Sequence, residues 1–89
     1  MFQVHVESVR REGDYTYTVV KAENHSSCKV DRIMFECTYF NDKGTAVKMA
    51  NGRVRQLEPG QSGHDEVPAS GKDLTSVTCR ATTVVGPRG

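Results

Sequence analysis

The sequence contains no tryptophan and only two leucines, and its apolar runs are short. None of them approaches the roughly 20 residues that a membrane-spanning helix needs. The first residues also lack the basic stretch followed by an apolar one that marks a signal peptide. The sequence therefore predicts a chain that does not span a membrane and is either cytoplasmic or found after removal of a leader. We favour the second reading because of the cysteines considered below.

Blocks of charge of one sign are missing as well. The 12 basic and 11 acidic residues are interspersed and leave a net charge of +1. The electrostatic attraction that drives binding to nucleic acid therefore has no evident source. We expect no nucleic-acid partner.

Residues that favour β-strands are abundant. Twelve valines and eight threonines stand against the two leucines, and β-branched side chains pack well on pleated sheets but lose rotamer freedom in helices. A chain of 89 residues makes one domain. We expect this domain to cover residues 1–85, followed by a flexible tail at 86–89.

Apolar and polar residues alternate with a period of two along most of the chain, which indicates strands separated by turns. The second strand has apolar residues on both faces and is expected to be central in its sheet. Asn51-Gly52 predicts a bulge or a tight turn within the fourth strand. The first of six expected strands begins at Phe2. The other five cover 15–22, 30–40, 45–57, 61–67 and 75–85, and a mobile loop is expected at 68–73. This pattern predicts an all-β, immunoglobulin-like β-sandwich of two antiparallel sheets with six to seven strands.

The three cysteines leave at least one thiol without a partner in the chain. Cys37 shares a strand face with Phe35, and Cys79 shares one with Val77, so both are expected in the core. We predict a Cys37–Cys79 disulfide and a free thiol at Cys28. A Cys28–Cys79 bridge and three unbridged cysteines are the alternatives. A disulfide would indicate that the protein resides in an oxidising compartment, where such bonds persist.

Other residues with reactive side chains form no recognisable site. His25 and Cys28 have the spacing of two zinc ligands, but zinc needs about four nitrogen or sulfur ligands. His64 and the acidic pair 65–66 lie on a polar strand with no neighbouring nucleophile. Asn24 begins a formal glycosylation sequon, although an Asx turn is the stronger reading. We expect no metal, no cofactor and no catalytic residue, and hence no enzyme.

Two further groups of side chains have structural interpretations. Arg53 and Arg55 alternate with Val54 and suit a solvent-facing edge strand, where charge discourages unwanted pairing. Most of the three tyrosines and three phenylalanines fall on the expected inward phase of the strands. We therefore expect the aromatic residues to belong mainly to the core.

Four short motifs resemble those of FxLYD-type domains, which are small immunoglobulin-like sandwiches of bacterial and archaeal exported proteins. The motifs are Val20-x-Ala22-x-Asn24-x-Ser26, Ile33-x-Phe35-x-Cys37, Tyr39-Phe40-Asn41-x-x-Gly44 and Leu57-x-Pro59-Gly60-Gln61. The resemblance covers residues 15–85, and Asn41 stands where the family typically has Asp. It implies a periplasmic or secreted protein with a non-enzymatic role in adhesion or interaction, and it carries over no catalytic residue.

The sequence thus favours a non-catalytic module that binds another protein or itself, with an undetermined oligomeric state. One alternative is a thiol redox or metal protein that uses Cys28. Another is a sandwich that binds a small ligand in a cavity lined by Tyr15, Tyr17 or Tyr39.

Overall fold

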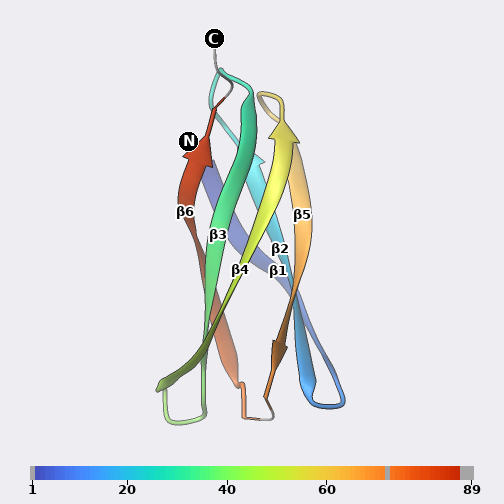
Figure 1. Ribbon diagram of the computed structural model, residues 1–89, viewed down its shortest axis with the longest axis vertical. Coiled ribbons are helices and arrows are strands. Elements are labelled where there is room, and N and C mark those ends of the chain that lie inside the picture. The colour runs from blue at the N-terminus through green and yellow to red at the C-terminus, as the bar shows by residue number, and fades with distance from the viewer. Residues whose placement is uncertain (1, 72, 87–89) are drawn as a thin grey trace.

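The computed structural model describes residues 2–71 and 73–86, which form six strands in two antiparallel sheets (Figure 1). The strands are β1 (Phe2–Glu12), β2 (Tyr15–Asn24), β3 (Val30–Phe40), β4 (Ala46–Leu57), β5 (Ser62–Ser70) and β6 (Ser76–Val85). One sheet has the order β1-β2-β5 and the other has the order β4-β3-β6. The expected all-β sandwich is confirmed.

The two sheets face each other along the long axis of a body with extents of 45 × 22 × 17 Å. β2 and β3 are the central strands of their sheets. For β2 this confirms the prediction made from the apolar residues on both faces of 15–22. Their inward side chains alternate with partly exposed ones along both strands. Antiparallel neighbours share this phase, so the buried residues of all strands meet in one core. Its buried apolar residues are Val20, Ala22, Val30, Ile33, Phe35, Cys37, Tyr39, Val54, Leu57, Val67, Ala69 and Leu74.

The hairpin between β3 and β4 forms where the turn residues predict it. Asn41 Oδ1 accepts hydrogen bonds from the backbone N–H groups of Lys43 (2.9 Å) and Thr45 (3.0 Å). Gly44 has a φ of 77°, which a residue without Cβ adopts readily. Asn41 therefore supplies the turn chemistry expected of an Asp at this position.

Two expectations about β4 and β5 are wrong. Asn51-Gly52 neither bulges nor turns, because β4 runs through it with Glu36 opposite Asn51 and Phe35 opposite Gly52. The stretch 68–73 is not simply a loop, since β5 continues to Ser70. Pro68 fits there because β5 is an edge strand that pairs only with β2 on one side.

Two bulges shift the side-chain phase of the outer strands. In β1 the register slips between Val6 and Ser8, and after it Val9 lies opposite the buried Thr18. In β6 the register slips so that Val84, rather than Val85, lies opposite the buried Ile33. Regular alternation from Val77 and Cys79 would place Val85 on the inner face, but one extra residue in the bulge inverts the faces beyond it.

The aromatic residues divide between core and surface, so the expectation that most are buried is wrong. Phe35 and Tyr39 are buried, whereas Phe2, Tyr17 and Phe40 are half-buried and Tyr15 is 48% exposed. Tyr15 and Tyr17 lie on the outer phase of β2, whose inner phase is filled by Thr16, Thr18 and Val20.

The edges of β4 and β5 meet in a close contact that we call the β4–β5 seam. A Cβ at Gly52 would lie 2.3 Å from Phe35 Cζ and 2.7 Å from Asp65 Oδ2. A Cβ at Gly63 would lie 2.6 Å from Val54 Cγ1. Glycine at these two positions lets the ring of Phe35 and the neighbouring strand approach the backbone. Residues 87–89 of the expected tail lie outside the described residues.

Replacement of Gly52 by alanine should lower the free energy of unfolding by about 1–3 kcal/mol, because the new methyl group overpacks the space beside the Phe35 ring. Urea unfolding monitored by circular dichroism measures this loss. The matched control is Gly86→Ala, where a Cβ meets nothing within 4 Å. Equal unfolding midpoints for the two variants would contradict the proposed close contact.

Candidate functional site

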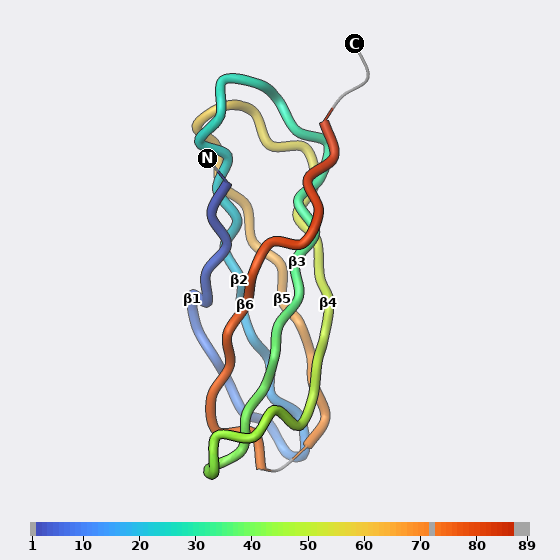
Figure 2. The backbone as a smooth tube through the Cα atoms, turned by 90° about the vertical axis from the view of Figure 1, so that its left-hand side faces the viewer, coloured from blue at the N-terminus to red at the C-terminus, as the bar shows by residue number. Residues whose placement is uncertain are grey.

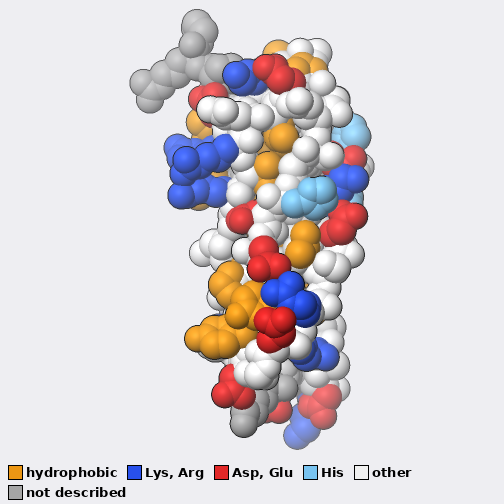
Figure 3. All heavy atoms as spheres, turned by 90° about the vertical axis from the view of Figure 1, so that its right-hand side faces the viewer, with side chains coloured by type: hydrophobic (Ala, Val, Ile, Leu, Met, Phe, Trp, Pro, Cys, Tyr) orange, Lys and Arg blue, Asp and Glu red, His pale blue; other side chains and the backbone are white. Residues whose placement is uncertain are grey.

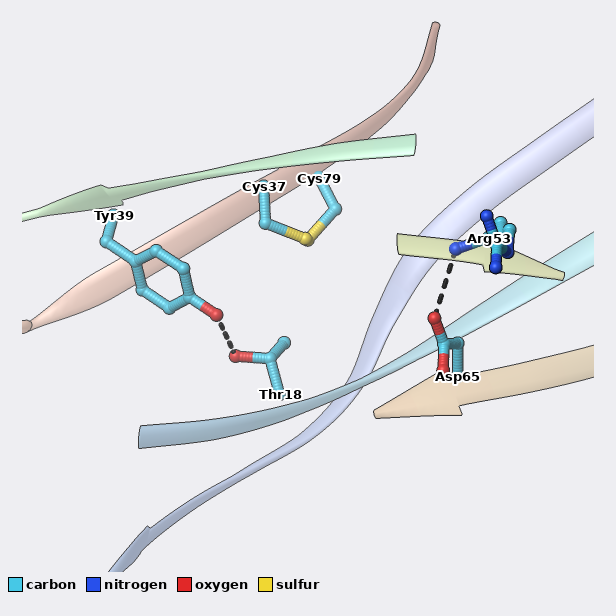
Figure 4. Close-up of a disulfide and its surroundings, with 6 residues drawn as sticks. All are labelled: Thr18, Cys37, Tyr39, Arg53, Asp65 and Cys79. Atoms are coloured by element: carbon cyan, nitrogen blue, oxygen red, sulfur yellow. Dashed lines mark hydrogen bonds between the residues drawn. A yellow bond between two sulfur atoms is a disulfide. The ribbon is translucent and has the colours of Figure 1, made fainter. Parts of the chain in front are cut away.

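Cys37 and Cys79 lie directly opposite each other on β3 and β6. Their sulfur atoms are 2.05 Å apart, at disulfide distance, and the pair closes a sequence separation of 42 residues (Figure 4). Cys37 is fully buried and Cys79 is partly buried against the core. The bridge thus joins two neighbours within one sheet rather than linking the two sheets.

Loss of the Cys37–Cys79 bridge should lower stability by up to about 4 kcal/mol, because a cross-link restricts the unfolded chain most when the enclosed loop is long. Urea unfolding of the Cys37→Ala/Cys79→Ala double variant tests this, with the exposed Cys28→Ser as the control. Thiol labelling of denatured protein should modify one cysteine before reduction and all three after it. Three labelled thiols before reduction would contradict the bridge.

Cys28 is exposed and free, in the loop between β2 and β3, as predicted for an unpaired thiol. His25, which is close to Cys28 in the sequence, pairs with Glu23 instead. His25 Nε2 lies 3.3 Å from Glu23 Oε2. His5 approaches the other oxygen of Glu23 at 3.6 Å. Within residues 2–71 and 73–86, no group of three or more His, Cys, Asp or Glu has a geometry that holds a metal ion.

The stretch 64–66 splits between two surfaces. His64 and Glu66 are exposed, and they pair with Glu7 (3.3 Å) and Arg10 (3.2 Å) on the outer face of the β1-β2-β5 sheet. The hydrogen bond to Glu66 raises the pKa of the Arg10 guanidinium. Asp65 has the opposite phase, and its Oδ2 accepts the backbone N–H of Arg53 at 3.0 Å across the β4–β5 seam (Figure 4). The polar strand expected at 64–66 thus faces solvent at His64 and Glu66, whereas Asp65 turns toward β4.

Asn24 is a structural anchor at the end of β2. Its side chain is fully buried, and its Nδ2 donates to the carbonyl oxygens of Cys28 (2.9 Å) and Leu57 (3.0 Å). Its Oδ1 accepts the N–H (3.0 Å) and the hydroxyl (2.7 Å) of Ser26, which forms the expected Asx turn. Both hydrogens of the amide nitrogen are used inside the protein. The folded chain therefore does not offer Asn24 as a glycosylation acceptor.

Replacement of Asn24 by alanine should lower the free energy of unfolding by about 1–3 kcal/mol, because the buried Leu57 carbonyl loses its side-chain donor. Asn51→Ala, at an exposed position of β4, is the matched control and should change stability little. Chemical unfolding of both variants provides the measurement. A loss at position 51 as large as that at position 24 would argue against the anchor.

A groove of about 500 Å³ lies between β1 and β6. We call it the β1–β6 groove. Figure 2 looks onto the side of the molecule on which these two strands lie. Thr16 and Tyr39 contribute buried residues from the two central strands, and valines of β1 and β6 contribute the apolar sides. The lining residues are Val6, Val9, Arg11, Thr16, Tyr39, Leu74, Thr75, Ser76 and Val77.

The groove is fixed by polar contacts between the sheets. The hydroxyl groups of Thr18 and Tyr39 are 2.6 Å apart in a buried hydrogen bond that joins β2 to β3 (Figure 4). Arg11 Nη2 donates to the carbonyl oxygen of Leu74, which links β1 to the segment before β6. Among the described residues of the lining, Arg11 is the single charged one, and none carries a carboxylate. The groove therefore combines the apolar side chains of its valines and Leu74 with hydroxyl groups and one positive charge.

Sequence reasoning missed this groove. Nothing in the sequence singled out Val9, Arg11 or Leu74, and Leu74 falls between the expected loop at 68–73 and the expected strand at 75–85. The available signal was the spacing Val6-Glu7-Ser8-Val9, in which two polar residues between valines break the alternation. This break coincides with the bulge that turns Val9 and Arg11 toward the groove. Of the three tyrosines suggested for a ligand cavity, Tyr39 lines the groove.

The other two tyrosines form a patch on the outer face of the β1-β2-β5 sheet. The rings of Tyr15 and Tyr17 are stacked with centroids 6.2 Å apart, and the Arg10 guanidinium lies 4.7 Å from the centroid of Tyr17. Because the Arg10 guanidinium covers the Tyr17 ring, part of this aromatic patch is already in contact with another side chain of the same chain.

A second apolar surface lies on the side of the molecule opposite the β1–β6 groove. Figure 3 shows apolar side chains gathered in the lower half of the side that carries β4 and β5. The exposed large apolar residues of β4 are Val47 (49%) and Met49 (58%). Val47 also borders a hollow of about 330 Å³ beside the β4–β5 seam. Lys48 crosses this hollow, and its Nζ donates to Ser70 Oγ at 2.6 Å.

Comparison of the chain with protein-family models, curated proteins and solved structures finds no match. Within the described residues, no helix is long and apolar enough to cross a membrane. The geometry of the chain itself is therefore the basis for a functional proposal.

Proposed function

We propose that this chain is a non-catalytic interaction module of an exported bacterial protein, and that it binds another protein at the open edge of its sandwich. The observation that carries this proposal is the β1–β6 groove. It places apolar side chains between two edge strands, and within the described part of the chain neither edge is paired on that side. Exposed strand edges are common docking sites for extended segments of partner proteins.

Export is the second element of the proposal. Two cysteines at disulfide distance are consistent with an oxidising compartment, where such bonds persist. The motif resemblance to FxLYD-type domains supports the same location. Cys28, exposed in its loop with no neighbouring cysteine or metal-ligand group among the described residues, lends no comparable support to a redox role.

A small-ligand module is the second candidate, because the groove volume of about 500 Å³ falls in the range of ligand pockets and Tyr39 contributes to the lining. The long, unpaired backbone edges beside the groove favour a polypeptide instead, since main-chain groups in a row match another main chain.

Site-specific photo-crosslinking tests the interaction function. A photoreactive phenylalanine derivative is placed singly at Val9, Tyr15 or Met49, which are 45%, 48% and 58% exposed on three different surfaces. Each protein is irradiated alone and with the extracellular and envelope fractions of its source. We expect a crosslinked product from the position 9 protein that excess unlabelled chain suppresses.

The positions separate the possible results. Saturable crosslinking at position 15 or 49 but not at position 9 would retain the interaction function and move it to another surface. Crosslinking of the protein to itself at position 9 would identify a second copy as the partner. Absence of saturable products at all three positions would overturn the proposal.

A further inference from the structure

We infer that the β1–β6 groove accepts an extended, acidic β-strand from another protein chain, which pairs with the free edge of β6 and places apolar side chains on Val9 and Val77. This inference rests on the proposed interaction function and specifies its partner. The occupant is defined by three properties of the groove, namely its backbone edge, its apolar side chains and its charge.

The free edge of β6 has few of the features by which proteins protect edge strands: a bulge interrupts it between Ala81 and Thr83, beyond the part that borders the groove. Charged residues and proline on an edge discourage pairing with foreign strands. β6 has ten residues, contains no proline and carries a single charge at Arg80. The other edge strands are protected: β5 contains Pro68 and an acidic pair, and β4 and β1 each contain several charged residues.

The position of the groove also corresponds to that of a missing strand. In the seven-stranded immunoglobulin arrangement, the last strand pairs with the free edge of the one before it. Here β6 occupies the penultimate place, beside the central β3, and no described strand pairs with its other edge. A strand supplied by a partner would complete the sheet at this edge.

Charge selects the side chains of the strand. Arg11 lies in the groove and forms no ion pair with a carboxylate of the residues the structure describes, while one of its nitrogens donates to the Leu74 carbonyl. A guanidinium has five N–H donors, so others are available to a ligand. An aspartate or glutamate on the incoming strand would pair with Arg11, whereas a lysine there would be repelled.

Peptide titration of the ¹⁵N-labelled, oxidised chain by NMR tests the inference. The probe is a blocked eight-residue peptide that alternates valine and threonine and contains one central aspartate. A second peptide has lysine in place of the aspartate, and a third has the aspartate but N-methylated backbone amides. We expect the first peptide to shift the amide signals of β1 and β6, the second to bind about tenfold more weakly, and the third not to bind.

Three protein variants test where the peptide binds and which charge it pairs with. Val9→Glu places a negative charge in the groove at a position already 45% exposed, and it should abolish binding of the aspartate peptide. Val47→Glu makes the same change at a 49% exposed position of β4 and should bind like the wild type. Arg11→Glu should reverse the preference so that the lysine peptide binds more tightly, a result that loss of folding cannot produce.

Each alternative result has a definite meaning. If the N-methylated peptide binds as tightly as the unmodified aspartate peptide, the groove binds apolar ligands without strand pairing. This result would overturn the inference. Absence of shifts in β1 and β6 at millimolar peptide would overturn it as well. If photo-crosslinking still detects a partner at position 15 or 49, the interaction function survives this failure.

Discussion

The close approach of β4 to β5 is the constraint on which the rest of the sandwich depends. Two three-stranded sheets enclose a core only if their edges meet, and here Gly52 and Gly63 remove the side chains that would hold those edges apart. The ring of Phe35 fills the space beside Gly52, and Asp65 closes the seam by accepting the N–H of Arg53. On the other side β1 and β6 also approach each other, but the β1–β6 groove remains open between them.

Polar groups inside the sandwich fix how the sheets face each other. The Thr18–Tyr39 hydrogen bond crosses the interior, and Asn24 connects the end of β2 to the ends of loops and strands around it. A buried polar side chain is costly unless its hydrogen bonds are made, and none of the described buried side-chain nitrogen or oxygen atoms lacks a partner. Such satisfied contacts disfavour sliding of one sheet over the other, because a shift would leave these atoms unpaired.

The sequence was sufficient for features that depend on local pattern. Strand β3, the Asn41 turn and the inward phase of Cys37 and Cys79 follow from regular alternation and turn chemistry. The errors arise where one residue interrupts the period, as at the bulges of β1 and β6, or where a residue serves a distant neighbour. Gly52 looked like a turn residue because the side chain that requires a glycine there, the Phe35 ring, lies on another strand. The groove was missed for the same reason: it lies between two strands far apart in the sequence.

The open edge has an energetic meaning that links the fold to the proposed function. A domain of this size buries only about 60–65% of the surface of its unfolded chain, so each unfilled apolar position matters to its stability. Val9 remains 45% exposed although the bulge in β1 turns it toward the interior. A side chain from an incoming strand would cover Val9 and Val77 while the backbone of that strand satisfies the edge of β6. The free energy that a seventh strand would contribute to folding then becomes free energy of association with the partner that supplies it.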